Sequence, residues 1–308
     1  MKIFLISFSL FIKFFSFLYI NSSKIFKIIN FNERNRFYRL ILLKETSNLL
    51  KKILKLLKFD LPITFHKDKI IFDLDGVKIE ENKDYINRYY KIQNTKYHNE
   101  AKYLDDLFDF SNARCFIDVG ACIGEYSIYF AKNYPLSKIF SIEPNTHNIK
   151  LFRKNIKLNK VESSIKVIEK AISDMKNQNY HMTPRAQESE AIIQNNDSQK
   201  KTITLSSLIS DEKLNKIDFI KIDIEGSNHK VAKCIIDNVS KIDGLQYEFN
   251  KGPAITFLNL IDQVNIFYDF YILEEEKFKS INEFDLKEKI KTFGSNSKSG
   301  IDVFFKKK

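Results

Sequence analysis

One short stretch, residues 115–131, constrains the fold of this chain more than any other feature. Its first part, Cys115 to Val119, is apolar apart from Asp118 and reads as a buried strand. The strand pattern breaks at Gly120, and after Gly124 the apolar residues recur at helical spacing. A strand, a glycine turn and a helix in this order are typical of a Rossmann-like sheet in which the turn approaches a ligand.

A second acid follows about twenty residues further on. Glu143 ends the next short apolar strand, in the sequence Ser141-Ile-Glu-Pro144. A carboxylate at a strand end can accept hydrogen bonds from both hydroxyls of a ribose. The glycine turn and Glu143 together predict a nucleoside-binding site.

The details of the turn favour one nucleoside. The dinucleotide fingerprint G-x-G-x-x-G is not met, because position 122 is Cys122 and position 125 is Glu125. Asp118, two residues before Gly120, would repel a pyrophosphate but tolerate a cation. A ligand with a ribose, no phosphate and a positive centre is S-adenosylmethionine. An NAD-dependent oxidoreductase is the alternative that these two departures argue against.

A third strand end supplies candidate catalytic residues. The apolar run from Ile217 ends in Asp223 and Glu225, and a helical pattern with His229 follows. Glu248 ends or nearly ends the next apolar strand. Because the carboxyl ends of parallel strands meet at one edge of a sheet, we expect these groups to share a crevice with Asp118. Each could serve as the base for a hydroxyl nucleophile, and Asp223 with Glu248 could instead bind a divalent metal. For Glu225, a capping role at the following helix fits equally well.

In one continuous order between residues 97 and 250, the chain resembles the FkbM family of methyltransferases. The resemblance rests on Phe116 to Ser127, Glu143-Pro144, Leu151 to Asn159, Ile168 to Asp174 and Lys221 to Gly226. It implies a class I S-adenosylmethionine-dependent fold and methylation of an oxygen on a sugar, a lipid-linked glycan or a polyketide.

The resemblance also implies roles for single residues. Asp118, Gly120 and Gly124 would lie along the methionine part of the cofactor, and Glu143 would bind its ribose. Cys122, in the same turn, would also contact the cofactor. Lys170 and Ala171 would lie along the adenine, and Asp223 beside the reacting centre. Glu100 resembles an acid that the family often has before the first strand.

Three positions depart from the pattern of the family. Cys122 stands where Asn is common, Ser206 replaces a usual Asp, and Asn228 replaces an acid. We expect Cys122 to be tolerated if its contact is made through the backbone. Ser206 and Asn228 leave open a second alternative, a membrane-tethered module that keeps the fold without the activity.

The predicted architecture is an α/β, Rossmann-like class I methyltransferase sheet, mostly parallel with an antiparallel edge strand. Residues 61–110 are a hairpin and helix leading into the catalytic sheet of residues 111–308, which together form one FkbM-like domain, 61–308. Strands are expected near residues 115–119, 138–142, 165–169, 217–222, 244–249, 267–273 and 301–305, and the last two are expected to form the reversed edge pair of this methyltransferase class. The polar segment 173–198 is interpreted as a hairpin or lid near the cofactor.

Residues 1–60 form a separate hydrophobic and basic region. An apolar run, Ile3 to Ile20, is broken only by Lys13 among charged residues and is just long enough to cross a bilayer. Between residues 24 and 58, ten basic residues face only two acids. Leu49 to Leu57 is an amphipathic basic helix pattern that suits an anionic membrane surface and, equally, a helix packed against the catalytic domain with its lysines in water. We therefore expect membrane association, by a span or on the surface, with the catalytic domain in the cytoplasm.

The net charge of +11 does not indicate a nucleic-acid partner. The base excess is concentrated in the amphipathic segment, and a groove of arginines with interleaved aromatic residues is not evident. The expected partners are a glycan or small-molecule acceptor and a membrane surface. Three cysteines without metal or redox spacing fit a reducing compartment.

Overall fold

The computed structural model describes residues 63–65, 69–74, 76–82, 100–182, 191–193, 200–224, 228–249, 254–274, 277–296 and 301–308. The chain divides into two compact units, residues 1–76 with 80–98 and residues 77–79 with 99–308. The predicted hydrophobic and basic region of residues 1–60 lies outside the described part. In the ranges that are described, no helix has both the length and the apolar character needed to cross a membrane.

A small sheet near the start of the described chain contains the predicted hairpin. It has the order β1-β2-β3, with strands Ile63–Phe65, Lys69–Leu74 and Val77–Asn82. Gly76 has φ +88°, the left-handed conformation that glycine adopts most easily, and its amide donates to Asp73 Oδ1 at 2.7 Å. The hairpin predicted from the Asp-Gly pair is therefore confirmed.

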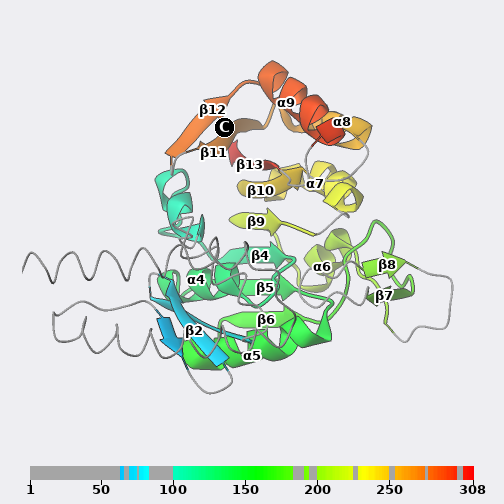
Figure 1. Cartoon of the computed structure of the whole chain (residues 1–308). Coiled ribbons are helices and arrows are strands. Elements are labelled where there is room, and N and C mark those ends of the chain that lie inside the picture. Colours follow the sequence, from blue (N-terminus) through cyan, green and yellow to red (C-terminus); the bar gives the residue numbers. More distant parts are fainter. Residues whose placement is uncertain are drawn as a thin grey trace, which may run out of the picture. The chain divides into compact units, whose positions relative to one another are not determined.

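The large sheet has the strand order β12-β11-β13-β10-β9-β4-β5-β6 (Figure 1). In chain order its strands are β4 (Cys115–Val119), β5 (Lys138–Ile142), β6 (Ile165–Ile168), β9 (Phe219–Ile222), β10 (Gly244–Phe249), β11 (Tyr268–Glu274), β12 (Lys277–Ile281) and β13 (Ile301–Lys307). All seven strands expected from the sequence are present. β12 was not expected.

The directions of the strands confirm a mostly parallel sheet but change the predicted edge. The five strands from β10 to β6 are parallel to one another. β13 pairs antiparallel with β11, which confirms the expected pair, but β13 lies between β10 and β11 instead of at the edge. The edge is taken by β12, which pairs antiparallel with β11. β13 is buried there because its apolar residues, such as Val303 and Phe305, need neighbours on both sides.

Helices cover both faces of this sheet (Figure 1). They are α4 (Glu125–Asn133), α5 (Thr146–Asn159), α6 (Leu205–Asp211), α7 (Ala232–Asp237), α8 (Ala254–Val264) and α9 (Glu283–Asn296). Short 3-10 helices precede β4 and α7 and link α7 to β10: η2 (Glu100–Asp106), η3 (Asn228–Val231) and η4 (Val239–Lys241). This alternation of strands and helices is the doubly wound pattern expected from the sequence.

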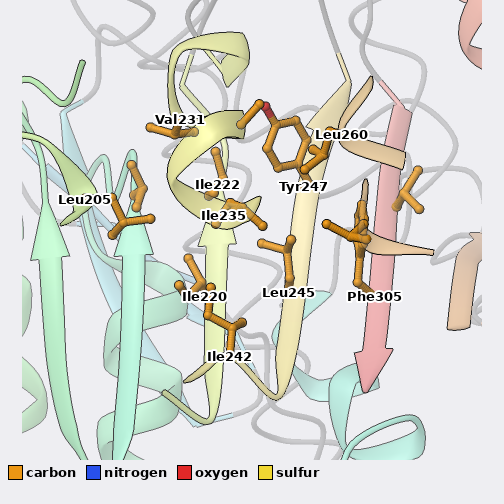
Figure 2. Packing of buried hydrophobic residues seen from close by; sticks show 14 of the residues in the cluster. Leu205, Ile220, Ile222, Val231, Ile235, Ile242, Leu245, Tyr247, Leu260 and Phe305 are labelled. Carbon is orange, nitrogen blue, oxygen red and sulfur yellow. The ribbon is translucent and has the colours of Figure 1, made fainter. Parts of the chain in front are cut away.

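Strand alternation gives the sheet two different faces. On one face, residues such as Ile117, Ile220 and Leu245 join a large hydrophobic core with the helices α6 to α9. Figure 2 shows side chains of β9, β10 and β13 against those of α7 and α8. On the other face, aromatic rings dominate; Phe116 stacks on Phe130 of α4 with ring centroids 4.1 Å apart.

The polar segment after β6 forms the predicted hairpin. Its strands, β7 (Tyr180–Met182) and β8 (Ala191–Ile193), pair antiparallel. Bridges from Ile172 to Ile203 and from Asn179 to Lys201 connect the base of this hairpin to the chain leading into α6.

Candidate active site

The glycine turn between β4 and α4 is shaped by the protein itself. Gly120 has φ +84°, and a Cβ there would lie 1.8 Å from the carbonyl oxygen of Asp223. Gly124 has φ +94°, and a Cβ there would lie 2.1 Å from the ring of Phe152. Both glycines thus let chain segments of this protein approach the turn. Close approach of a ligand, the reason expected from the sequence, stays a prediction.

Cys122 links the turn to the second predicted binding residue. Its φ is +50°, a left-handed conformation that is uncommon for residues other than glycine and is better tolerated by Asn. In this conformation its amide donates to Glu143 Oε2 at 2.9 Å. The contact is made through the backbone, which explains how Cys can stand where Asn is common.

Glu143 follows β5 directly and is 5% exposed. Its Oε1 accepts from the Asn145 amide at 2.8 Å and from Asn148 Nδ2 at 3.2 Å. Burial raises the pKa of Glu143 to about 7, against the lowering effect of its hydrogen bonds. A carboxylate offers about four acceptor positions, so these three contacts leave one on Oε2 for a ligand hydroxyl, instead of the two positions expected for both ribose hydroxyls.

Asp118 is almost fully buried on β4, at 1% exposure. Its Oδ2 accepts from Ser127 Oγ at 2.6 Å, and Ser127 Oγ lies 2.8 Å from Ser141 Oγ. Its Oδ1 has no hydrogen-bond partner among the described residues. Burial raises the pKa of Asp118, and the nearby ammonium of Lys221 opposes that rise.

Asp223 lies beside this turn, at the end of β9. Its amide donates to the carbonyl of Val119 at 3.0 Å, so its backbone continues the pairing of β9 with β4. Its side chain is 41% exposed and forms an ion pair of 2.9 Å with Lys221 Nζ. The structure therefore brings Asp118, Asp223 and the glycine turn together, as predicted. Lys221 was not among the predicted residues, although a charged residue inside an apolar strand was a visible signal.

The other predicted catalytic residues are Glu248, His229 and Glu225, and the structure places them differently. Glu248 is near the end of β10, and its Oε2 lies 3.3 Å from Asn228 Nδ2. His229 lies in η3, and burial, aided by Lys230, lowers its pKa and favours the neutral imidazole. Its Nδ1 is buried and has no hydrogen-bond partner in the described ranges. Glu225 lies outside the described residues.

Asn228 fixes the segment between β9 and α7. It is fully buried; its Oδ1 accepts from the Ile224 amide at 2.6 Å, and its Nδ2 donates to the Glu248 carbonyl at 2.8 Å. Its own carbonyl accepts from the Tyr247 hydroxyl at 2.5 Å. An acid here could not donate to the Glu248 carbonyl, so the departure from the usual pattern has a structural role. Ser206, the other departure, lies 2.9 Å from Cys234 Sγ through its hydroxyl oxygen.

The residues predicted to lie along the adenine follow β6. Lys170 is exposed, whereas Ala171 is 2% exposed and its carbonyl accepts from the Ile203 amide at 2.9 Å. Tyr180 of the β7–β8 hairpin is buried beside them. Burial raises the pKa of its phenol, the Ala171 backbone opposes this, and the Glu143 carboxylate adds to it. Tyr180 was not predicted, because the sequence shows only that a polar insertion begins there.

Two further predictions, the role of Glu100 and a bound metal ion, are not supported by the described structure. Glu100 begins η2, and its side chain lies outside the description. In the described part of the chain, no three or more His, Cys, Asp or Glu residues are grouped so that they could hold a metal ion. The metal alternative stays a prediction.

Comparison with known proteins gives one family. The sequence pattern of the methyltransferase FkbM domain matches residues 118–284, more than half of the chain. No curated protein matches the sequence. Among solved structures, the fold is similar to that of Pyrococcus abyssi tRNA (uracil-54, C5)-methyltransferase in complex with S-adenosyl-L-homocysteine, with 14% identity, TM-score 0.42 and coverage of 79% of this chain and 45% of that one.

Two further structures show similar likeness. M. capricolum TrmK in complex with S-adenosyl-homocysteine has 12% identity, TM-score 0.37 and coverage of 67% of each chain. Precorrin-6y C5,15-methyltransferase from Geobacter metallireducens has 13% identity, TM-score 0.39 and coverage of 68% of this chain and 87% of that one.

Proposed function

The chain belongs to the FkbM methyltransferase family, and from this premise we propose that it is an S-adenosylmethionine-dependent O-methyltransferase. The acceptor that we propose is a hydroxyl of a glycan or a lipid-linked sugar. The family supports methyl transfer as the reaction class. The donor and the acceptor are our own extension. The donor rests on the residues around the glycine turn, and the acceptor rests on the resemblance to the family and on the sequence of residues 1–60.

The observation that carries the proposed donor is the geometry of Glu143. Its carboxylate is held at the carboxyl end of β5 by the Cys122 and Asn145 amides, at 2.9 and 2.8 Å, and keeps one acceptor position on Oε2. This suits a ribose hydroxyl, which donates one hydrogen bond to it. Asp118, Glu143 and Asp223 outnumber the nearby cation Lys221, and this excess of acids suits a cationic sulfonium and disfavours a pyrophosphate.

When bound, the donor supplies a methyl group that its sulfonium has already activated. The protein must then align the acceptor hydroxyl with this methyl and exclude water, which can contribute on the order of 7–11 kcal/mol. We propose Asp223 as the base, because its carboxylate pairs with the Lys221 ammonium and is exposed at the strand end. Bound there, the donor would supply the methyl group and keep the sulfur as its thioether, and Asp223 would accept the proton that the acceptor hydroxyl loses.

The proposed setting is a membrane surface. It is supported by the sequence of residues 1–60 alone, with its apolar run and its basic amphipathic pattern. An enzyme held there would meet lipid-linked sugars, with its catalytic unit in the cytoplasm where methyl donors are made. Cell fractionation tests this proposal: a full-length protein that stays in the supernatant after lysis in low salt would contradict it.

Calorimetry on the full-length protein tests the donor. We expect S-adenosylhomocysteine to bind and NAD not to bind. Glu143→Gln should weaken S-adenosylhomocysteine binding by about tenfold or more, because a neutral amide accepts more weakly than a carboxylate. Glu169→Gln is the matched control, since Glu169 is exposed and paired with Arg153. Folded protein that gives no heat with S-adenosylhomocysteine would refute the proposal.

Methyl transfer from radiolabelled S-adenosylmethionine tests the acceptor. Octyl glycosides of common hexoses and deoxyhexoses serve as soluble substitutes for a lipid-linked sugar, beside glycerol and a mixed tRNA fraction. We expect label in at least one glycoside and none in RNA. Binding of S-adenosylhomocysteine without transfer to any glycoside would favour the inactive module instead.

A further inference from the structure

Lys221 is a buried cation inside the apolar strand β9. It is 6% exposed, and a lysine is almost never buried in this way unless its charge is paired. In register with it lie Asp118 on β4 and Gln246 on β10, each 1% exposed. These three side chains form a buried polar row across three adjacent strands, on the face opposite the large hydrophobic core.

The ammonium of Lys221 makes its hydrogen bond outside this row. Its hydrogen bond goes to Asp223 Oδ2 at 2.9 Å, and it lies 5.0 Å from the centre of the Tyr126 ring. Asp118 takes its hydrogen bond from Ser127 instead, and its Oδ1 has no partner among the residues described. If Lys221 served only to neutralise the buried row, its hydrogen bond would be expected at Asp118.

The ion pair of Lys221 and Asp223 is buried at the lysine and exposed to solvent at the aspartate. The side chain of Lys221 is 8% exposed, whereas that of Asp223 is 41% exposed. The backbone of Asp223 is also fixed, because its amide pairs with Val119 and its carbonyl fills the space over Gly120. A carboxylate anchored by its backbone and by a buried ammonium has little freedom to rotate. The exposed member of the pair, Asp223, lies at the glycine turn.

We propose that Lys221 is a positioning residue for methyl transfer, which holds the Asp223 carboxylate in one orientation at the end of β9. This inference rests on the proposed function, in which Asp223 accepts the proton of the acceptor. The charged groups that act on the Lys221 ammonium are Asp223, Asp118 and, from β13, Asp302. Of these, only Asp223 is hydrogen-bonded to it.

A double-mutant cycle tests the inference. Lys221→Met, Asp223→Asn and the double variant are compared in the full-length protein with the glycoside that is methylated best. We expect each single variant to lower kcat by about tenfold or more, with the KM for S-adenosylmethionine and the affinity for S-adenosylhomocysteine within about threefold of wild type. The double variant should be no slower than the slower single variant, because both remove the same arrangement.

Two further variants separate position from charge and from the loss of any lysine. Lys221→Arg keeps the charge and should recover part of the kcat that Lys221→Met loses. Lys233→Met is the matched control, because Lys233 is 83% exposed and forms an ion pair of 3.1 Å with Asp237 on α7. It should behave as wild type.

The inference is overturned if Lys221→Met transfers methyl at the wild-type rate, or if the two single effects multiply in the double variant. If circular dichroism shows that Lys221→Met does not fold, Asp223→Glu decides, because it displaces the carboxylate by one methylene. A wild-type kcat in Asp223→Glu would then refute positioning. Wild-type protein that binds no S-adenosylhomocysteine or methylates no glycoside refutes the proposed function first. Transfer that is indifferent to Lys221 refutes only this inference.

Discussion

The backbone amide of Cys122 donates to Glu143 Oε2 at 2.9 Å and so joins the two strand-end motifs of the site. Cys122 belongs to the turn after β4 and Glu143 to the end of β5, neighbouring parallel strands. The bond depends on the left-handed conformation of Cys122, at φ +50°. The left-handed backbone of Cys122 in the turn therefore fixes the position of the Glu143 carboxylate at the end of β5.

Substitution of Cys122 tests this relationship. Cys122→Gly should leave the free energy of unfolding unchanged or raise it by about 1 kcal/mol, because glycine adopts this conformation without strain. Cys122→Val should lower it by about 1–2 kcal/mol and weaken S-adenosylhomocysteine binding, because a β-branched residue resists the conformation. Urea unfolding and calorimetry measure the two effects. Equal stability of both variants would contradict the strained turn.

The pKa of Glu143 predicts how stability depends on pH. It is raised from 4.5 to about 7 in the folded protein, so between these pH values the folded state holds a proton that the unfolded state has lost. The free energy of unfolding should therefore fall as the pH rises through this window, by on the order of 3 kcal/mol from this group. Urea unfolding at a series of pH values measures it. Buried Asp118 contributes in the same direction, since its pKa is also raised.

Comparison with Glu143→Gln isolates the contribution of Glu143, because the amide does not titrate. The slope of stability against pH should become shallower in this variant between about pH 4.5 and 7. An unchanged slope would show that Glu143 is not protonated in the folded protein.

Alanine substitutions at Gly120 and Gly76 distinguish the cost of a steric clash from the cost of backbone strain. Both have positive φ, but a Cβ at Gly76 meets nothing within 4 Å, whereas one at Gly120 lies 1.8 Å from the Asp223 carbonyl oxygen. Gly76→Ala should cost about 1–2 kcal/mol of stability from strain alone. Gly120→Ala should cost more than about 4 kcal/mol, because the end of β9 must move. Unfolding of both variants is measured in urea, and similar costs would contradict the close approach.

Asn228 is predicted to be a structural residue. Asn228→Asp removes the Nδ2 donor to the Glu248 carbonyl and places a charge beside the Glu248 carboxylate. We expect a loss of about 2–4 kcal/mol of stability, measured by thermal or urea unfolding. Asn238→Asp is the control: Asn238 also donates to a carbonyl, that of Cys234 at 2.9 Å, but it is only partly buried. Its loss should be smaller. Equal losses would refute the special role of Asn228.

Local sequence patterns predicted most of the large sheet. Strand β4, the glycine turn and strand β5 were found because their apolar runs and breaks are short-range signals. The Asp-Gly pair before Val77 predicted the hairpin for the same reason. β12 was missed, because Lys277–Ile281 is polar and largely exposed and depends on its neighbour β11 for its conformation.

The order of strands and helices, the two glycines of the turn and the acids at the strand ends could all be predicted from the amino-acid sequence. These follow from periodicity and backbone conformation, which act over a few residues. Only the tertiary structure decided that Gly120 makes room for the Asp223 carbonyl, that β13 lies between β10 and β11, and that the Lys221 ammonium reaches Asp223 instead of Asp118. Strand pairing and burial bring together groups that lie far apart along the chain, and no local pattern specifies which partner a buried charge meets.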